Sequence, residues 1–175
     1  VQDSIIDAPG IVAIQARGAE CTVGRCTVFG KEEPVAVEGT AEWTTENNEL
    51  NTPAMQVLFA SESVFTGQVV VERNQEGCAR FCYFTEGSMV PRRYRCQPDL
   101  ALDALPDAAT AANKAAVRAR LRPQFSSTTY GEPDYAQLRL SCDVGIRTGA
   151  EDGSEMGAFE FLKQPHRAAN LRLAV

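Results

Sequence analysis

Histidine and tryptophan are almost absent from this chain of 175 residues, since each occurs once, as His166 and Trp43. A single histidine near the C-terminus, with no nucleophile placed toward it in the sequence, argues against Ser/His or Cys/His catalysis. It also argues against a zinc site, because the cysteines include no Cys-x-x-Cys pair to complete one. We therefore expect neither a metal nor a cofactor.

Long apolar runs and an excess of positive charge are also missing. No apolar run approaches the roughly 20 residues that cross a bilayer, so we expect no membrane span. Acidic residues outnumber basic ones by 23 to 17, which gives a net charge of −6 and argues against nucleic-acid partners. With 44% hydrophobic residues, the chain is long enough and apolar enough to bury a core.

Cysteine, by contrast, is well represented, with six residues: Cys21, Cys26, Cys78, Cys82, Cys96 and Cys142. A chain of this length and composition does not need disulfides for stability, and free cysteine behaves as a small buried hydrophobe. We expect reduced, mostly buried thiols, and disulfide pairing is the alternative.

A four-residue word of the form small, apolar, large, polar is the strongest signal. Its copies begin at Ser4, Cys26, Ser63 and Cys82, so the first two are 22 positions apart and the last two 19. Glycine or proline follows each copy, and a second apolar segment follows about seven residues after two of them. Strand and turn repeated at a period near 20 is typical of a parallel β-helix.

Stacking the words assigns each position to a face, because alternate residues of a strand point to opposite sides. Small residues then alternate with large ones along the interior, in the columns Ser4, Cys26, Ser63, Cys82 and Ile6, Val28, Phe65, Phe84. The outward column is Ile5, Thr27, Val64 and Tyr83, and the column before the word is Asp3, Arg25, Glu62 and Phe81. We expect opposite charges of this last column to form surface ion pairs on neighbouring coils.

The sequence therefore predicts a mainly β protein: a short right-handed parallel β-helix of about four coils, with an Ala-rich helix and an irregular α/β C-terminal tail. Residues 1–87 form the coils, with an inserted loop at 32–54, and residues 88–175 form a capping or tail region. The helix is expected over 107–121, between Pro106 and Pro123. Exposed strand edges at a solenoid end need a cover, and the tail is the candidate.

Two sets of residues could carry a function other than a structural one. Paired acids on an outward face would indicate a polysaccharide lyase or glycosidase, but the sequence offers only Asp3, Asp7 and Glu62, with Arg25 between the first and the last. Trp43 and Tyr83 are the candidates for a carbohydrate-binding module, since aromatic rings anchor sugars and protein partners.

The repeat words resemble those of right-handed parallel β-helix proteins. Four segments are moreover similar to the C-terminal part of large uncharacterised bacterial proteins that accompany phage-tail-like, contractile-injection-type gene clusters: Cys21–Gly30, Ala60–Gly67, Pro91–Pro98 and Gly153–Phe159. Against that pattern the insertion at 32–54 is long, and the chain stops at Val175 where a longer helix is expected.

This resemblance implies a structural or attachment role with no catalytic residues to carry over. It implies protein partners, through self-association or a larger assembly, with a glycan as a further possible partner. The expected location is a cytoplasmic assembly in bacteria, and an extracellular location or a released particle is the alternative. Because the chain opens at Val1 without methionine, we expect it to be a piece of something longer.

Overall fold

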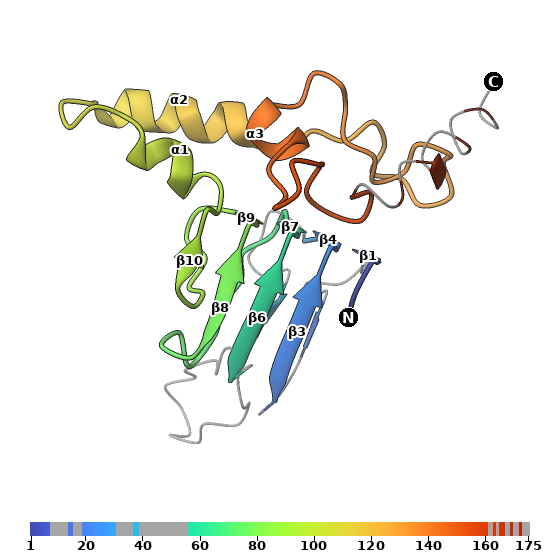
Figure 1. Ribbon diagram of the computed structural model, residues 1–175, viewed down its shortest axis with the longest axis horizontal. Helices are drawn as coiled ribbons and strands as arrows, with labels where there is room; N and C mark the ends of the chain where they lie inside the picture. The colour runs from blue at the N-terminus through green and yellow to red at the C-terminus, as the bar shows by residue number, and fades with distance from the viewer. Residues whose placement is uncertain are drawn as a thin grey trace, which may run out of the picture.

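The computed structural model describes residues 1–7, 14–15, 19–30, 37–38 and 56–160, and the single positions 163, 165, 166, 169 and 172. In this part the protein is mainly β, with two four-stranded parallel sheets, a two-stranded one and few helices (Figure 1). Trp43 and most of the predicted insertion 32–54 lie outside the described residues.

The two large sheets share the chain between them in alternation. The β4 sheet contains β1 (Ile5–Asp7), β4 (Thr27–Phe29), β7 (Val64–Phe65) and β9 (Tyr83–Phe84), in this order. The β6 sheet contains β10 (Arg93–Tyr94), β8 (Gly77–Arg80), β6 (Val57–Ser61) and β3 (Glu20–Gly24), in this order. The small sheet pairs β2 (Ile14–Gln15) with β5 (Val37–Glu38). Along the chain, β3, β6 and β8 of the β6 sheet are each followed directly by a strand of the β4 sheet, namely β4, β7 and β9.

The register of the β4 sheet is the one that the repeat words predict. Ile6 pairs with Val28, Val28 with Phe65, and Phe65 with Phe84, while Ile5, Thr27, Val64 and Tyr83 pair along the outward column. Val28, Phe65 and Phe84 are fully buried in the core between the two sheets. The rings of Phe65 and Phe84 stack with centroids 5.0 Å apart and planes 6° apart. The predicted interior column of large residues is therefore confirmed, and Cys26, Ser63 and Cys82 of the column of small residues are buried as well.

Parallel pairing continues past residue 87, where the words appeared to stop. Strand β10 pairs with β8, and Gln97 forms a further bridge with Tyr83. The word of this coil reads Cys96-Gln97-Pro98-Asp99, so a proline replaces the large apolar residue and hides the repeat. The guanidinium of Arg93 then covers the last ring of the column, 5.5 Å from the centroid of Phe84.

The corner between the two sheets has one recurring backbone conformation. A non-glycine residue with φ of 50–52° stands there in every coil: Asp3, Arg25, Glu62, Phe81 and Arg95. Side chains other than glycine enter this left-handed region at a cost of roughly 1–2 kcal/mol. The chain accepts that cost at each corner because the bend aligns both neighbouring strands with their sheets.

Each bend also explains why the next residue is serine or cysteine. The amide of Cys26 finds no carbonyl on the next coil and donates instead to the Ser63 hydroxyl (3.1 Å), as the amide of Ser63 donates to the Cys82 thiol (3.5 Å). The same side chains donate to the carbonyl two residues back, Ser63 to Ser61 (2.7 Å) and Cys82 to Arg80 (3.1 Å). A buried amide without an acceptor is costly, so the position requires a small side chain that accepts a hydrogen bond.

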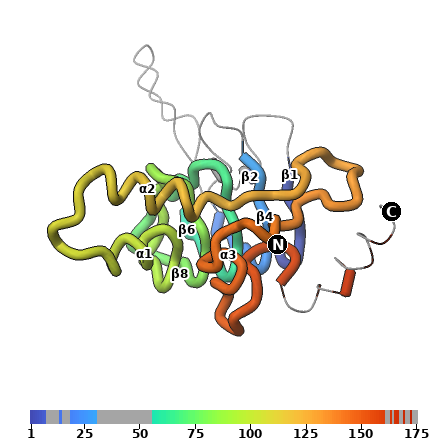
Figure 2. The backbone as a smooth tube through the Cα atoms, turned by 90° about the horizontal axis from the view of Figure 1, so that it is seen from above, coloured from blue at the N-terminus to red at the C-terminus, as the bar shows by residue number. Residues whose placement is uncertain are grey.

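The helices and the C-terminal region lie over the outward face of the β4 sheet (Figure 1). Helix α1 (Asp99–Asp103) follows the last coil, α2 (Ala111–Leu121) is the predicted Ala-rich helix, and α3 (Val144–Arg147) is short. Helix α2 begins at Ala111 rather than at the predicted residue 107, because its N-cap Thr110 forms a capping box with Asn113. Figure 2, seen from above, shows the segment after α2 running across the stack toward β1.

Substitution of Ser63 tests the corner hydrogen bonds. We expect Ser63→Ala to lower the free energy of unfolding by about 1–3 kcal/mol, because the buried amide of Cys26 loses its acceptor. Ser63→Cys should be much better tolerated, since cysteine occupies the same position at Cys26 and Cys82. Urea denaturation of the three proteins measures the difference, and equal losses for alanine and cysteine would show that packing alone selects the residue.

Candidate functional site: the charged corner

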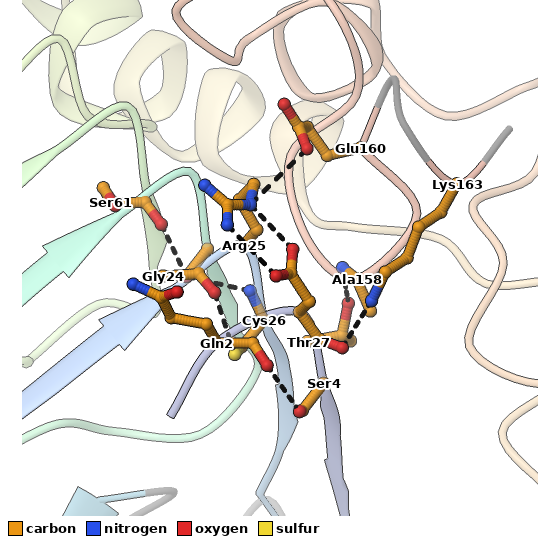
Figure 3. A network of polar contacts seen from close by, with 12 residues as sticks. Gln2, Ser4, Gly24, Arg25, Cys26, Thr27, Ser61, Ala158, Glu160 and Lys163 are labelled. Carbon is orange, nitrogen blue, oxygen red and sulfur yellow. Dashed lines mark hydrogen bonds and ion pairs between the residues drawn. The ribbon is translucent and has the colours of Figure 1, made fainter.

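The charged corner is formed by the side chains of Asp3, Arg25 and Glu62 together with residues of the C-terminal segment. Arg25 binds Asp3 through two hydrogen bonds, Nε to Oδ1 at 2.7 Å and Nη2 to Oδ2 at 3.0 Å. Its Nε also lies 3.6 Å from Oε2 of Glu160, as Figure 3 shows. The predicted ion pair between neighbouring coils is confirmed, and Glu160 joins it from 135 positions further along the chain.

The two acids that flank Arg25 differ in their proton affinity. The hydrogen bond from Arg25 lowers the pKa of Asp3 below its ordinary value of 3.8. Burial raises the pKa of Glu160 above 4.5, and the nearby carboxylates of Glu62, Asp152 and Asp3 raise it further against the effect of Arg25. The carboxylates of Asp3, Glu62 and Glu160 thus act on the one guanidinium of Arg25.

The same corners hold the C-terminal segment through backbone contacts. The amide of Gly157 donates to the carbonyl of Glu62 (2.8 Å), and the amide of Ala158 donates to Oγ1 of Thr27 (3.0 Å). Gly157 has φ of +101°, and a Cβ there would lie 2.6 Å from Oγ1 of Thr27. Lys163 donates through Nζ to the carbonyl of Asp3. Glycine at 157 is thus what lets the segment approach the sheet so closely.

The remaining enzymatic candidates are engaged in the same way. Asp7 accepts a hydrogen bond from the Tyr135 hydroxyl (2.7 Å), whose ring lies beside Phe29 with centroids 5.7 Å apart. Oε1 of Glu62 accepts the amide of Glu151 at 3.4 Å. Asp3, Asp7 and Glu62 therefore each contact the C-terminal region, Asp3 through its carbonyl and the other two through their carboxylates.

Tyr83, the described one of the two predicted ligand-binding residues, lies beneath the C-terminal region. Its side chain is 7% exposed and packs in a cluster with Leu121, Ile146 and Met156. The ring thus presents no open face for stacking on a sugar. His166 is exposed.

The outer face of the β6 sheet is the large surface that no described segment crosses in Figure 1. Phe59 is 41% exposed there and Tyr94 57%. Arg80 lies beside Tyr94 in the register and forms an ion pair with Glu151 at 3.5 Å. Glu20, an exposed acid on this face, pairs with Val57 rather than with a second carboxylate.

The cysteines form no metal or disulfide site in the described part of the chain. All six are free, and all but Cys78 are buried, which confirms the prediction of mostly buried thiols. Burial raises the pKa of the Cys26 and Cys82 thiols, so they remain protonated at neutral pH. Among the described residues no group of three or more His, Cys, Asp or Glu could hold a metal ion.

Sequence reasoning missed Glu160 and Lys163 at this corner, and no local pattern marks them. Arg95 was missed as well, although the pair Arg95-Cys96 repeats the pair Arg25-Cys26 and could have revealed the last coil.

Comparison with known proteins gave no match: no family model, no curated protein and no solved structure is significantly similar to the chain. Among the described residues, no helix is long and apolar enough to cross a membrane.

Asp3→Asn tests the ion pair with Arg25. Because the pKa of Asp3 is lowered in the folded state, its contribution to stability is present above pH 3.8 and is lost as the pH falls through the lowered value. The pair is partly exposed and screened by solvent, so we expect a loss of about 1 kcal/mol or less at neutral pH. Denaturation between pH 2 and 7, with Asp107→Asn on an exposed turn as the control, measures it; a difference that persists unchanged at pH 2 would contradict the assignment.

Glu160→Gln should show the opposite dependence on pH. The raised pKa of Glu160 means that the folded protein binds the proton more tightly than the unfolded chain, so this group makes stability fall as pH rises from 4.5 through the folded value. The glutamine variant lacks that slope. Stability curves of both proteins between pH 4 and 8 should diverge over this window in favour of the variant, and parallel curves would rule the effect out.

Proposed function

We propose that this chain is a non-enzymatic structural or surface-attachment module of a larger bacterial, phage-tail-like assembly, and that its stack is a short right-handed parallel β-helix. The proposal rests on the contacts that the outward-facing acidic residues make within the chain. Asp3, Asp7 and Glu62, the candidates for polysaccharide chemistry, all contact the chain's own C-terminal region. Residues engaged in this way help to hold the C-terminal region on the stack, and this use supports a structural role.

The packing supports a load-carrying role. The interior is a continuous column of buried side chains with stacked Phe65 and Phe84, and every corner adds a hydrogen bond between coils. Parallel coils joined in this way resist separation along the whole stack, because each coil contacts its neighbours through two sheets. A rigid body of this kind suits an assembly component.

The alternatives remain a lyase or glycosidase fragment and a carbohydrate-binding module. The exposed rings of Phe59 and Tyr94 on the β6 sheet are the feature that favours the second, since exposed aromatic rings stack on sugars. Binding to a glycan array that disappears in Phe59→Ala or Tyr94→Ala would support it.

The direct test is to locate the protein in the cell. Phage-tail-like particles purified from the source bacterium should contain this chain by mass spectrometry, and an antibody should label a fixed position on them in the electron microscope. Particles from a strain without the gene serve as the control. If the chain is missing from the particles, and the purified protein cleaves polysaccharide until Asp3→Asn or Glu62→Gln abolishes the activity, the structural role is wrong.

A further inference from the structure

The left-handed corner residues contact other parts of the chain, with one exception. The charged corner contacts the C-terminal region, and the ring of Phe81 meets that of Tyr94 edge to face, with centroids 5.7 Å apart. Arg95, the last corner residue, is exposed and has φ of 52°. Among the described residues its side chain has no hydrogen bond, ion pair or ring contact. The strained bend at Arg95 thus presents a guanidinium that no described segment uses.

Arg95 belongs to a group of three exposed arginines around the ring of Tyr94, which we call the arginine patch: Arg80, Arg92 and Arg95. Arg92 lies on the same face as Tyr94, two positions before it, and Arg80 pairs with Tyr94 between β8 and β10. In the part of the chain that the structure describes, Arg92 has no ion pair. Arg80 has one, from Nη1 to Oε2 of Glu151 at 3.5 Å, between side chains that are both about half exposed. The patch can therefore still bind anionic groups.

The other acidic residues near the patch are engaged or distant. Glu76 lies 3.6 Å from Arg73, and Asp99 binds Arg93 at 2.7 Å. Glu62 stands two coils away in the corner column and contacts the C-terminal region. The acidic residue of β3 lies at the opposite edge of the sheet. The patch is therefore a local excess of positive charge on a chain whose net charge is −6.

The rest of this face indicates what kind of anion fits. Phe59, 41% exposed, and Tyr94, 57% exposed, lie on either side of β8, whose outward residues are Cys78 and Arg80. A guanidinium accepts no hydrogen bond and a thiol accepts only weakly, so a sugar lying across both rings would find few acceptors for its hydroxyls. Carboxylates bind arginine through strong, often paired hydrogen bonds, and an apolar side chain packs well on an exposed ring. The face therefore favours an acidic peptide with an apolar residue over a glycan.

We propose that the arginine patch binds an acidic, extended segment of a partner protein, with carboxylates on Arg92 and Arg95 and an apolar side chain on the ring of Tyr94. This inference rests on the proposed assembly role and specifies the chemistry of the partner. Arg92 and Arg95 are three positions apart, about 10 Å along the strand, and alternate residues of an extended peptide recur about every 7 Å. Two acids that flank one apolar residue at alternate positions thus match the patch, within the reach of arginine side chains.

The probe is a fluorescent peptide of the sequence Ser-Glu-Ser-Leu-Ser-Glu-Ser, and its control has glutamine in place of both glutamates. We expect saturable binding of the first peptide to the full chain, with NMR shift changes at Arg80 and at residues 92–95, and no measurable binding of the second. Arg92→Gln and Tyr94→Ala should each weaken binding roughly threefold or more. Arg139→Gln removes the same charge from an exposed position in the C-terminal region and should leave binding unchanged.

Arg95→Gly separates binding from folding. Glycine adopts the left-handed conformation without the steric cost of a side chain, so this variant should unfold at the same urea concentration as the native protein or a higher one. It should nevertheless bind the peptide roughly threefold or more weakly, because one guanidinium is lost. Unchanged binding in Arg95→Gly, or an equal loss in Arg139→Gln, overturns the inference.

The remaining outcomes concern the class of partner. Absence of saturable binding overturns the inference. Tighter binding of polygalacturonate or of a single-stranded oligonucleotide, lost in Arg92→Gln and Arg95→Gly, would assign the patch to a glycan or a nucleic acid and overturns it as well. The particle experiment stands apart: a chain found in particles that binds no acidic peptide keeps its assembly role and loses this site.

Discussion

A buried amide that lacks a carbonyl partner is the constraint on which this structure depends. The left-handed residue at each corner turns the chain from one sheet into the other, and in doing so it leaves the following amide facing the interior. Serine or cysteine at that place accepts the amide from the neighbouring coil and donates to the carbonyl two residues back. The cost of leaving such a group unpaired exceeds the net gain from an ordinary hydrogen bond, so the corner allows few residue types.

The corner also explains how the C-terminal region is held. A left-handed bend projects its side chain and carbonyl outward, where they can meet another segment. Glu62 accepts Gly157 through its carbonyl, and Arg25 meets Glu160 through its guanidinium. The strained bends thus make the contacts that hold the C-terminal segment over the β4 sheet. Val64 and Tyr83 of the outward column are buried beneath this segment and form a second hydrophobic core with its residues.

This arrangement bears on function because the acidic residues that polysaccharide cleavage would need form contacts within the chain. Here Asp7 is hydrogen-bonded to Tyr135 and Asp3 to Arg25. Among the described residues, the outer face of the β6 sheet stays accessible, with Phe59 and Tyr94 exposed on it.

The sequence by itself determined the stacking of the coils. Side chains alternate between the two faces of each strand with a period of two. Together with the repeated word, this alternation is enough to assign Ile6, Val28, Phe65 and Phe84 to one interior column. Only the tertiary structure decided that Tyr83 is covered, that Glu160 and Lys163 reach the corner and that Asp7 meets Tyr135. The contacts of Asp7, Glu160 and Lys163 join residues more than 100 positions apart, and the residues that cover Tyr83 come from other elements. Such pairs leave no periodic trace in the chain. The last coil escaped detection for a related reason: Arg93 and Pro98 close the stack, and a terminal coil departs from the repeat because it has a neighbour on one side alone.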